Sequence, residues 1–269
     1  MKAHGDSPCK DMEHSLKPHS IGSGRATAAR DFPVRPGAAP SIEAETSKIM
    51  LGVLMLQTQF PRLAGDVGHP ASFRMPVRWQ VVQGATPERV VPQTDAALLA
   101  PFIDAAHQLI SQGARALTTS CGFLVRFQQE LQAALPVPVW TSSLLKLPEL
   151  HRPGVLTVDA GSLGPAELVC AGAAADTPVE GLAPGCSLQR TLLLDLPTLD
   201  PPAARQDVVE AALRLMGRHP HLDAIVLECT NMPPYADDVA RVTGLPVHHV
   251  MTLVHERWAR LPRARVGAA

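Results

Sequence analysis

Residues 116–123 (A-L-T-T-S-C-G-F) and residues 225–235 (I-V-L-E-C-T-N-M-P-P-Y) contain the features that decide the fold. Each segment begins as an apolar run typical of a buried strand, reaches a cysteine, and passes directly into a turn and a helical pattern. Open α/β sheets bind their ligands at the carboxyl ends of the strands. The two cysteines, Cys121 and Cys229, therefore stand where a binding site is expected, one in each half of the chain.

The two halves repeat the same order of elements. A Gly-Val-Leu motif opens an apolar run at Gly52, and the same motif opens another at Gly154. Each run is followed by a loop, by a stretch with apolar residues at helical spacing, and by a strand that ends in a cysteine. We interpret this repetition as an internal duplication.

Strand and helix patterns alternate from residue 49 onward. The expected strands are 49–57, 79–82, 115–120, 137–141, 155–159, 178–182, 192–194, 224–228 and 247–250. The expected helices are 94–112, 124–134, 165–174, 201–218, 234–243 and 251–260. This alternation predicts an α/β fold with doubly wound, mostly parallel sheets.

Residues 1–45 differ from the rest because they mix Pro, Gly, Ser, His and charge without periodicity. We expect a disordered extension there, and the spacing of its cysteine and histidines matches no zinc motif. The final helical stretch is expected to pack back on the first sheet. The domain prediction is therefore a first domain of residues 46–135 plus 245–269 and a second domain of residues 136–244.

The composition argues against several classes of function. The chain has 24 basic and 25 acidic residues and a formal net charge of −1, so it carries no electrostatic footprint for nucleic acid. No apolar run is long enough to span a membrane, and residues 1–20 lack the apolar core of a secretory signal. Five scattered cysteines favour reduced thiols and a cytoplasmic location.

Cysteines at strand-to-helix turns suggest reactive thiols. Backbone N–H groups and the helix dipole stabilise a thiolate there and lower its pKa. The same turns offer Gly122, Thr230 and Asn231 as donors to a substrate carboxylate. The hydroxyls of Thr119 and Ser120 are further candidates for binding carboxylate oxygens. Because free cysteine also often fills a core, the residues alone leave catalytic and structural roles equally open.

Three segments resemble the aspartate/glutamate/hydantoin racemase superfamily. Residues 227–233 (L-E-C-T-N-M-P) are similar to the family motif Leu-Gly-Cys-Thr-His-aromatic-Pro. Residues 119–121 (T-S-C) stand where the family places its other cysteine, and the Gly-Val-Leu motif at Gly52 matches its first strand. The resemblance covers about residues 48–260.

The resemblance implies two pseudo-symmetric α/β domains with the active site in the cleft between them. It implies a racemase or epimerase that needs no cofactor and no metal, in which Cys121 and Cys229 exchange protons with a carbon next to a carboxylate or carbonyl. The expected partner is a small carboxylate or a hydantoin-like substrate, and a homo-oligomer stays open. Three of the five lysines lie in the expected extension, which agrees with chemistry independent of pyridoxal phosphate.

The sequence departs from the family pattern at positions that hold the substrate. Gly122 replaces an asparagine, Asn231 replaces a histidine, and Gln57 with Thr58 replaces Asp-Ser at the end of the first strand. All four belong to the predicted substrate-binding set. Since auxiliary acid or base groups are missing, we expect a substrate whose α-carbon is more acidic than that of free glutamate.

Alternatives remain open at this stage. A decarboxylase or a cis–trans isomerase of the same superfamily could use the same cleft, and so could a non-catalytic protein that binds a small molecule. Asp66 and His69 lie in the loop after the first strand, where they are either substrate contacts or turn residues. Glu228 is expected to orient the backbone beside Cys229. A zinc hydrolase is disfavoured because the histidines match no metal motif.

Overall fold

The computed structural model describes residues 49–92 and 94–262, so the predicted extension 1–45 lies outside the described residues. Two parallel four-stranded sheets form its framework. The first contains β1 (Met50–Met55), β2 (Val77–Val81), β3 (Ala114–Thr119) and β4 (Val139–Trp140), and the second contains β5 (Pro153–Thr157), β6 (Val179–Gly181), β7 (Ala224–Leu227) and β8 (Val247–His248). The strand orders, β2-β1-β3-β4 and β6-β5-β7-β8, are equivalent. The α/β prediction is confirmed, and the predicted repeat is present as one shared topology.

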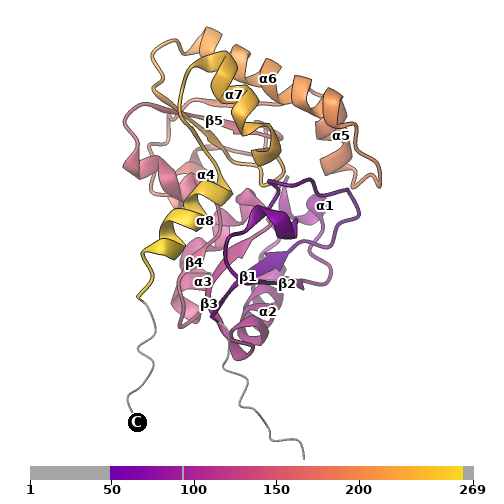
Figure 1. The fold of residues 1–269 in the computed structure, drawn as a ribbon, viewed down its shortest axis with the longest axis vertical. Coiled ribbons are helices and arrows are strands. Elements are labelled where there is room, and N and C mark those ends of the chain that lie inside the picture. The colour runs from indigo at the N-terminus through magenta and orange to yellow at the C-terminus, as the bar shows by residue number, and fades with distance from the viewer. Residues whose placement is uncertain (1–48, 93, 263–269) are drawn as a thin grey trace, which may run out of the picture. The chain divides into compact units, whose positions relative to one another are not determined.

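Helices connect the strands (Figure 1). The α-helices are α1 (Pro87–Val90), α2 (Leu99–Ser111), α3 (Gln128–Ala134), α4 (Pro165–Cys170), α5 (Ser187–Leu193), α6 (Pro201–Arg218), α7 (Ala236–Thr243) and α8 (Val250–Ala259). The 3-10 helices are η1 (Pro70–Ser72), η2 (Ala96–Leu98), η3 (Gly122–Phe127), η4 (Ser143–Glu149) and η5 (Pro233–Tyr235). Figure 1 shows α2 beside the first sheet and α6 beside the second.

One predicted strand is wrong. Residues 192–194 were expected to be extended, but Leu192 and Leu193 belong to α5. Leu188 and Leu192 are both buried on this helix, at the i, i+4 spacing that places them on one face. An apolar run of three residues is too short to distinguish a strand from a buried helix face.

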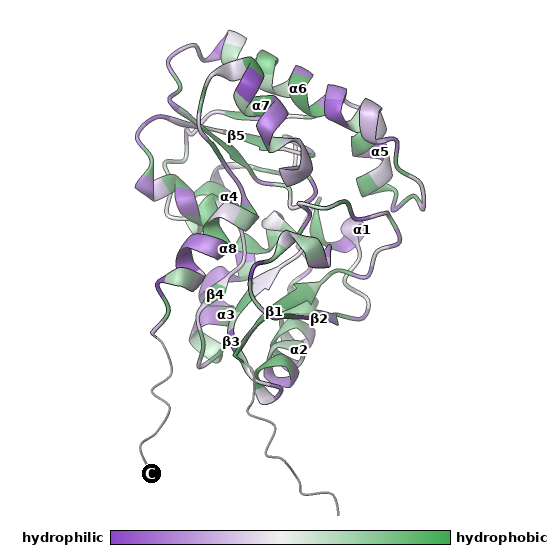
Figure 2. Ribbon diagram, viewed as in Figure 1, coloured by the Kyte–Doolittle hydropathy of each residue, from purple (hydrophilic) through white to green (hydrophobic). Residues whose placement is uncertain are grey.

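Alternation along β1 shows why the first sheet is covered on both faces. Leu51 and Val53 pack in one apolar cluster with Val250 of α8. Leu54 belongs to the other cluster, together with Phe102 of α2. Figure 2 shows β1 in the green of apolar residues, whereas α6 alternates between green and purple. The helix at the end of the chain therefore covers the first sheet, as expected.

The chain changes sheets at points that differ from the predicted boundaries. Val139 of β4 pairs with Leu117 of β3, so β4 belongs to the first sheet rather than to the second domain. Val247 of β8 pairs with Ile225 of β7, so β8 belongs to the second sheet. The crossovers come after β4 and after β8. Both β4 and β8 have only two residues, which is too short a pattern to predict which sheet each strand joins.

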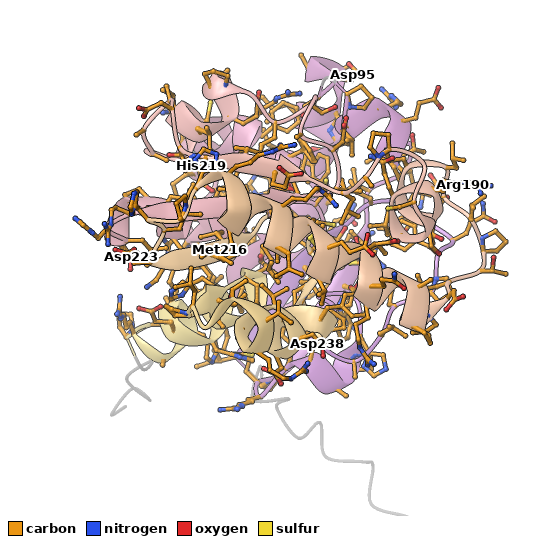
Figure 3. All side chains as sticks on the ribbon, turned by 90° about the horizontal axis from the view of Figure 1, so that it is seen from above. Asp95, Arg190, Met216, His219, Asp223 and Asp238 are labelled. Atoms are coloured by element: carbon orange, nitrogen blue, oxygen red, sulfur yellow. The ribbon has the colours of Figure 1, made fainter. Side chains whose placement is uncertain are left out.

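Charged side chains gather on the outside. Figure 3 shows Asp95 and Asp223 at the periphery, and each forms an ion pair with an arginine. Exposed pairs of this kind contribute about 0–1 kcal/mol each, so the apolar core dominates the stability. Among the described residues, no helix is both long enough and apolar enough to cross a membrane.

Gly217 offers a simple test of the helix assignment. It lies near the end of α6, and an added Cβ would meet nothing within 4 Å. We expect Gly217→Ala to raise the free energy of unfolding by about 0.5–1 kcal/mol, because alanine loses less conformational entropy in a helix. Urea unfolding followed by circular dichroism measures the change, and a destabilised variant would contradict the open environment.

Candidate active site

The two cysteines line one cavity. Cys121 follows β3 and Cys229 follows β7, which are equivalent strands of the two sheets. Both side chains are buried, and the same pocket contacts both. A charge on Cys121 raises the pKa of Cys229, which places the two thiols within electrostatic reach of each other. The duplicated topology thus brings the two strand ends to one site.

Hydroxyl groups join the two turns that carry the cysteines. The hydroxyl of Thr230 donates to the carbonyl of Ser120 at 2.7 Å, linking the turn after β7 to the turn after β3. Ser120 Oγ accepts from the backbone N–H of Leu56 at 2.8 Å. The hydroxyl of Ser143 donates to the carbonyl of Leu227 at 2.7 Å. The Thr230–Ser120 bond ties together the two turns that carry the thiols, and all three hydrogen bonds are buried.

Glu228 is the residue that sequence analysis missed as part of the site. Its side chain is fully buried and lines the same cavity as the two cysteines. One carboxylate oxygen, Oε2, accepts from the hydroxyl of Thr157 at 2.7 Å, whereas Oε1 has no hydrogen-bond partner among the described residues. Burial raises the pKa of Glu228 to about 7. One signal in the sequence could have identified Glu228: the family motif has glycine at this position.

Glu228 also explains Gly122. A Cβ at Gly122 would lie 2.2 Å from Glu228 Oε1 and 2.5 Å from the Glu228 carbonyl oxygen. Both distances are far below van der Waals contact, so only glycine fits against this carboxylate. Gly122 thereby makes room for an acid in the cavity.

The thiol pKa prediction is wrong for this arrangement. Burial, together with the charge of Glu228, raises the pKa of Cys121 to about 12 and that of Cys229 well above its ordinary value. The backbone N–H groups of Phe123 and Asn231 lower the pKa of Cys121 and Cys229, respectively, as predicted, but burial raises both pKa values by more. Cys121 is followed by the short 3-10 helix η3 rather than by an α-helix, which weakens the expected dipole effect.

The charges around the two thiols differ. Arg62 and Arg126 lower the pKa of Cys121 and offset part of the rise. The charges that act on Cys229, those of Glu228, Cys121 and Asp66, all raise its pKa. The surroundings of Cys121 thus include cations, whereas the charges that act on Cys229 are all negative.

A polar chain leads from the loop after β1 to Cys229. The Cys229 thiol donates to Asn231 Oδ1 at 3.6 Å, and the Asn231 amide donates to Asp66 Oδ2 at 2.5 Å. Asp66 is buried and its Oδ1 accepts from Arg62 at 3.1 Å. Of the two loop candidates, Asp66 thus connects to the site, whereas His69 accepts from the Ala71 N–H in an exposed turn and does not line the cavity.

The predicted substrate-binding residues divide into two groups. Ser120, Gly122, Thr230 and Asn231 line the cavity. The other three, Gln57, Thr58 and Thr119, do not.

Each of those three side chains is engaged elsewhere. Gln57 is exposed and accepts from the Gly84 N–H, and Thr58 accepts from Arg62. The Thr119 hydroxyl points to the carbonyls of Cys121 and Thr141, at 2.9 and 2.6 Å. Alternation along β3 explains this outcome, because Thr119 and Ser120 project to opposite sides.

The remaining lining is apolar. It comprises Leu56, Phe60, Pro87, Val91, Phe123, Val158, Leu192 and Leu193. The cavity is partly open to solvent and small, with a volume of about 30 Å³. Among the described residues, no group of three His, Cys, Asp or Glu side chains could hold a metal ion.

Asp195 holds one wall in place. It follows α5 and accepts from the backbone N–H of Gln59 at 2.7 Å, so the second half closes over the loop after β1. Asp195 has φ 49°, in the left-handed region that costs energy for a residue with a side chain. Figure 1 shows α5 close to α1 on this side, and the two helices are in contact.

We therefore expect Asp195 to limit access to the thiols. We expect Asp195→Ala to increase the rate of thiol alkylation several-fold, because the hydrogen bond to the Gln59 N–H is lost. Asp195→Asn keeps an acceptor and tolerates the left-handed conformation, so it should alkylate like the original chain. Mass spectrometry of iodoacetamide-treated protein, read at Cys121 and Cys229, measures both variants. Equal alkylation in all three proteins would contradict this role.

Comparison with known proteins gives relatives by sequence. No family model matches the chain. A dimethylsulfoniopropionate lyase from Durusdinium sp. clade D is 32% identical over 238 residues, covering 79% of this chain and 74% of the relative. Dimethylsulfoniopropionate lyases 7 and 3 from Emiliania huxleyi (strain CCMP1516) are 28% and 29% identical. They match 75% and 78% of this chain, which spans 64% and 59% of their own lengths.

Solved structures share the fold at lower identity. Unliganded arylmalonate decarboxylase matches with a TM-score of 0.51 and 17% identity, covering 81% of this chain and 97% of that protein. Glutamate racemase from Thermus thermophilus matches with a TM-score of 0.51 and 18% identity, covering 80% of each chain. These neighbours confirm, at the level of fold, the resemblance to the aspartate/glutamate/hydantoin racemase superfamily.

Proposed function

Because this chain belongs to the family of the dimethylsulfoniopropionate lyases and has the fold of the aspartate/glutamate/hydantoin racemase superfamily, we propose that it is a lyase for dimethylsulfoniopropionate or a close analogue. The observation that carries the proposal is the 32% identity over most of both chains. The composition of the cavity also supports it. The polar side of the cavity, with the two thiols, suits the carboxylate of the substrate, and the apolar wall suits its methyl groups.

The proposed reaction is a β-elimination. A thiolate takes a proton from the carbon next to the carboxylate, and the electron pair of that C–H bond forms a double bond to the β-carbon. The bond from the β-carbon to sulfur breaks, and its electron pair leaves with sulfur as neutral dimethyl sulfide. The products are dimethyl sulfide, acrylate and a protonated thiol, which returns its proton to solvent. The balance needs no oxidant, reductant or electron carrier.

Cys121 is the proposed base, because two arginines favour its ionised form. Cys229, surrounded by negative groups, stays protonated and donates a hydrogen bond to the carboxylate, where negative charge grows in the transition state. The hydroxyl of Ser120 and the backbone N–H groups of Thr230 and Asn231 are the other proposed carboxylate donors. In this proposal Gly122 serves to leave room for Glu228.

The test is direct. Purified protein is incubated with millimolar dimethylsulfoniopropionate, dimethyl sulfide is measured in the headspace by gas chromatography, and acrylate is measured by NMR. Stoichiometric release of both products well above the rate in buffer is expected. Absence of dimethyl sulfide would overturn the proposed substrate.

Racemase chemistry is the second candidate, because two thiols on one cavity could approach a stereocentre from both sides. Chiral α-carboxylates and hydantoins are followed in heavy water for exchange of the α-hydrogen. Inversion without dimethyl sulfide release would favour the racemase.

The pH dependence follows from the raised thiol pKa. Because the base form is the thiolate, and the pKa of Cys121 is raised to about 12, raising the pH increases the reactive fraction throughout the neutral range. We expect kcat/KM for dimethylsulfoniopropionate to rise from pH 6 to pH 9 without a plateau. Initial rates at low substrate concentration measure it. A maximum near pH 6 would show that a thiolate is not the base.

A further inference from the structure

Glu228 is a buried acid without a balancing cation. Within residues 49–92 and 94–262, no lysine or arginine lines the cavity, and Glu228 is the one carboxylate that does. The two arginines that act on Cys121 are paired elsewhere, Arg126 with Glu167 at 2.6 Å and Arg62 with Asp66 at 3.1 Å. A buried charge normally requires a partner, because its loss of hydration is costly.

The position of the unpaired oxygen, Oε1 of Glu228, is set by two neighbours. Oε2 is held by the Thr157 hydroxyl, and the absence of a side chain at Gly122 leaves space for Oε1. Oε1 has no partner among the described residues, although it is completely buried. A carboxylate arranged in this way lacks one contact, and the larger part of the cavity wall is apolar.

We propose that Glu228 is the counter-ion for a cationic group of the substrate, so that the site selects carboxylates with a methylated onium group at the β-carbon over neutral or dianionic analogues. A methylated onium group has no N–H or O–H, so it needs negative charge and apolar contact rather than hydrogen-bond acceptors. Glu228 supplies the charge, while Leu56 and Phe123 supply apolar and aromatic surface. The inference deepens the proposed function and rests on it for the position of the onium group.

The counter-ion also connects binding to chemistry. In the free site the charge of Glu228 raises the pKa of both thiols. A bound onium group neutralises this charge, so the thiol that acts as base ionises more readily when the correct substrate is present. A dicarboxylate would add a further negative charge and have the opposite effect.

The test compares two ligands that have the same shape and differ in charge: 3-(trimethylammonio)propanoate and its carbon analogue 4,4-dimethylpentanoate. Affinities are measured by isothermal titration calorimetry, which needs no turnover, at a pH above 8, where Glu228 with its pKa of about 7 is ionised. We expect the original chain to bind the cationic ligand about 10- to 100-fold more tightly, the range of a charge-assisted contact. Glu228→Gln, which keeps an acceptor for Thr157, should reduce this preference to less than about threefold.

Glu180→Gln is the matched control. Glu180 is also a buried glutamate of the second half, but it pairs with Arg214 and Arg218 and does not line the cavity. This variant should keep the full preference for the cation. Equal affinity of the original chain for both ligands would overturn the proposal even if the glutamine variant failed to fold.

The outcomes separate this inference from the lyase proposal. A cation preference that depends on Glu228, without dimethyl sulfide release, would support the counter-ion and refute the lyase. Dimethyl sulfide release with no charge preference, or with a preference unchanged in Glu228→Gln, would support the lyase and refute the counter-ion.

Discussion

Cys121→Ser is expected to lower the rate of dimethyl sulfide release by about 10²–10⁴-fold, the range for loss of a general base. A serine hydroxyl is far less acidic than a thiol, so the base form disappears at neutral pH. Cys229→Ala should lower the rate by about 10²–10³-fold, because a donor to the carboxylate is removed. Serine is nearly isosteric with cysteine, and alanine removes only the sulfur atom, so both variants should fold like the original chain.

Cys170 provides the control. It lies in α4, is partly buried, and does not line the cavity. Cys170→Ser should retain the full rate of dimethyl sulfide release. Full activity in Cys121→Ser would eliminate the thiolate base. If instead both cavity variants lost racemisation while retaining exchange of the α-hydrogen of one enantiomer, the two-base racemase would explain the site better.

Gly122→Ala is expected to have the second largest effect. The new Cβ would lie 2.5 Å from the carbonyl oxygen of Glu228, which belongs to the backbone and cannot rotate away. The turns after β3 and β7 must then separate, and the two thiols move with them. We expect a loss of about 1–3 kcal/mol in the free energy of unfolding, as for other overpacked interiors, and loss of most lyase activity. Urea unfolding and headspace chromatography measure the two effects.

Gly161→Ala tests whether the effect is specific. A Cβ at Gly161 would have its nearest neighbour at 3.5 Å, an ordinary contact in a loop. This variant should keep both stability and activity. Unchanged stability in Gly122→Ala would mean that the two turns do not pack as tightly as the distances require.

The sequence predicted the features that depend on local pattern. Strand–helix alternation indicated the α/β class, and α6 was predicted at its observed bounds because proline begins it and apolar spacing continues through it. The cysteines at the ends of β3 and β7 indicated the location of the site. Each of these features is encoded within one strand, one helix or one turn.

The tertiary structure decided which residues meet. Gln57 was predicted to bind substrate from its position beside β1, but its side chain turns to the Gly84 N–H. Leu192 reaches the cavity from α5, although its short apolar run resembled a strand. Both outcomes depend on contacts between segments far apart in the chain, which local spacing does not specify.

The chemistry of the site shows the same division. A cysteine in a turn predicted a lowered thiol pKa, because the sequence displays the turn. The sequence does not show that the thiol of Cys121 loses its contact with water on folding. It also does not show that Glu228, in the turn after β7, packs against Gly122, in the turn after β3. The sequence alone thus placed each of the two thiols at the end of a strand. Burial and a carboxylate in close contact, which exist only in the folded chain, decided how readily these thiols ionise.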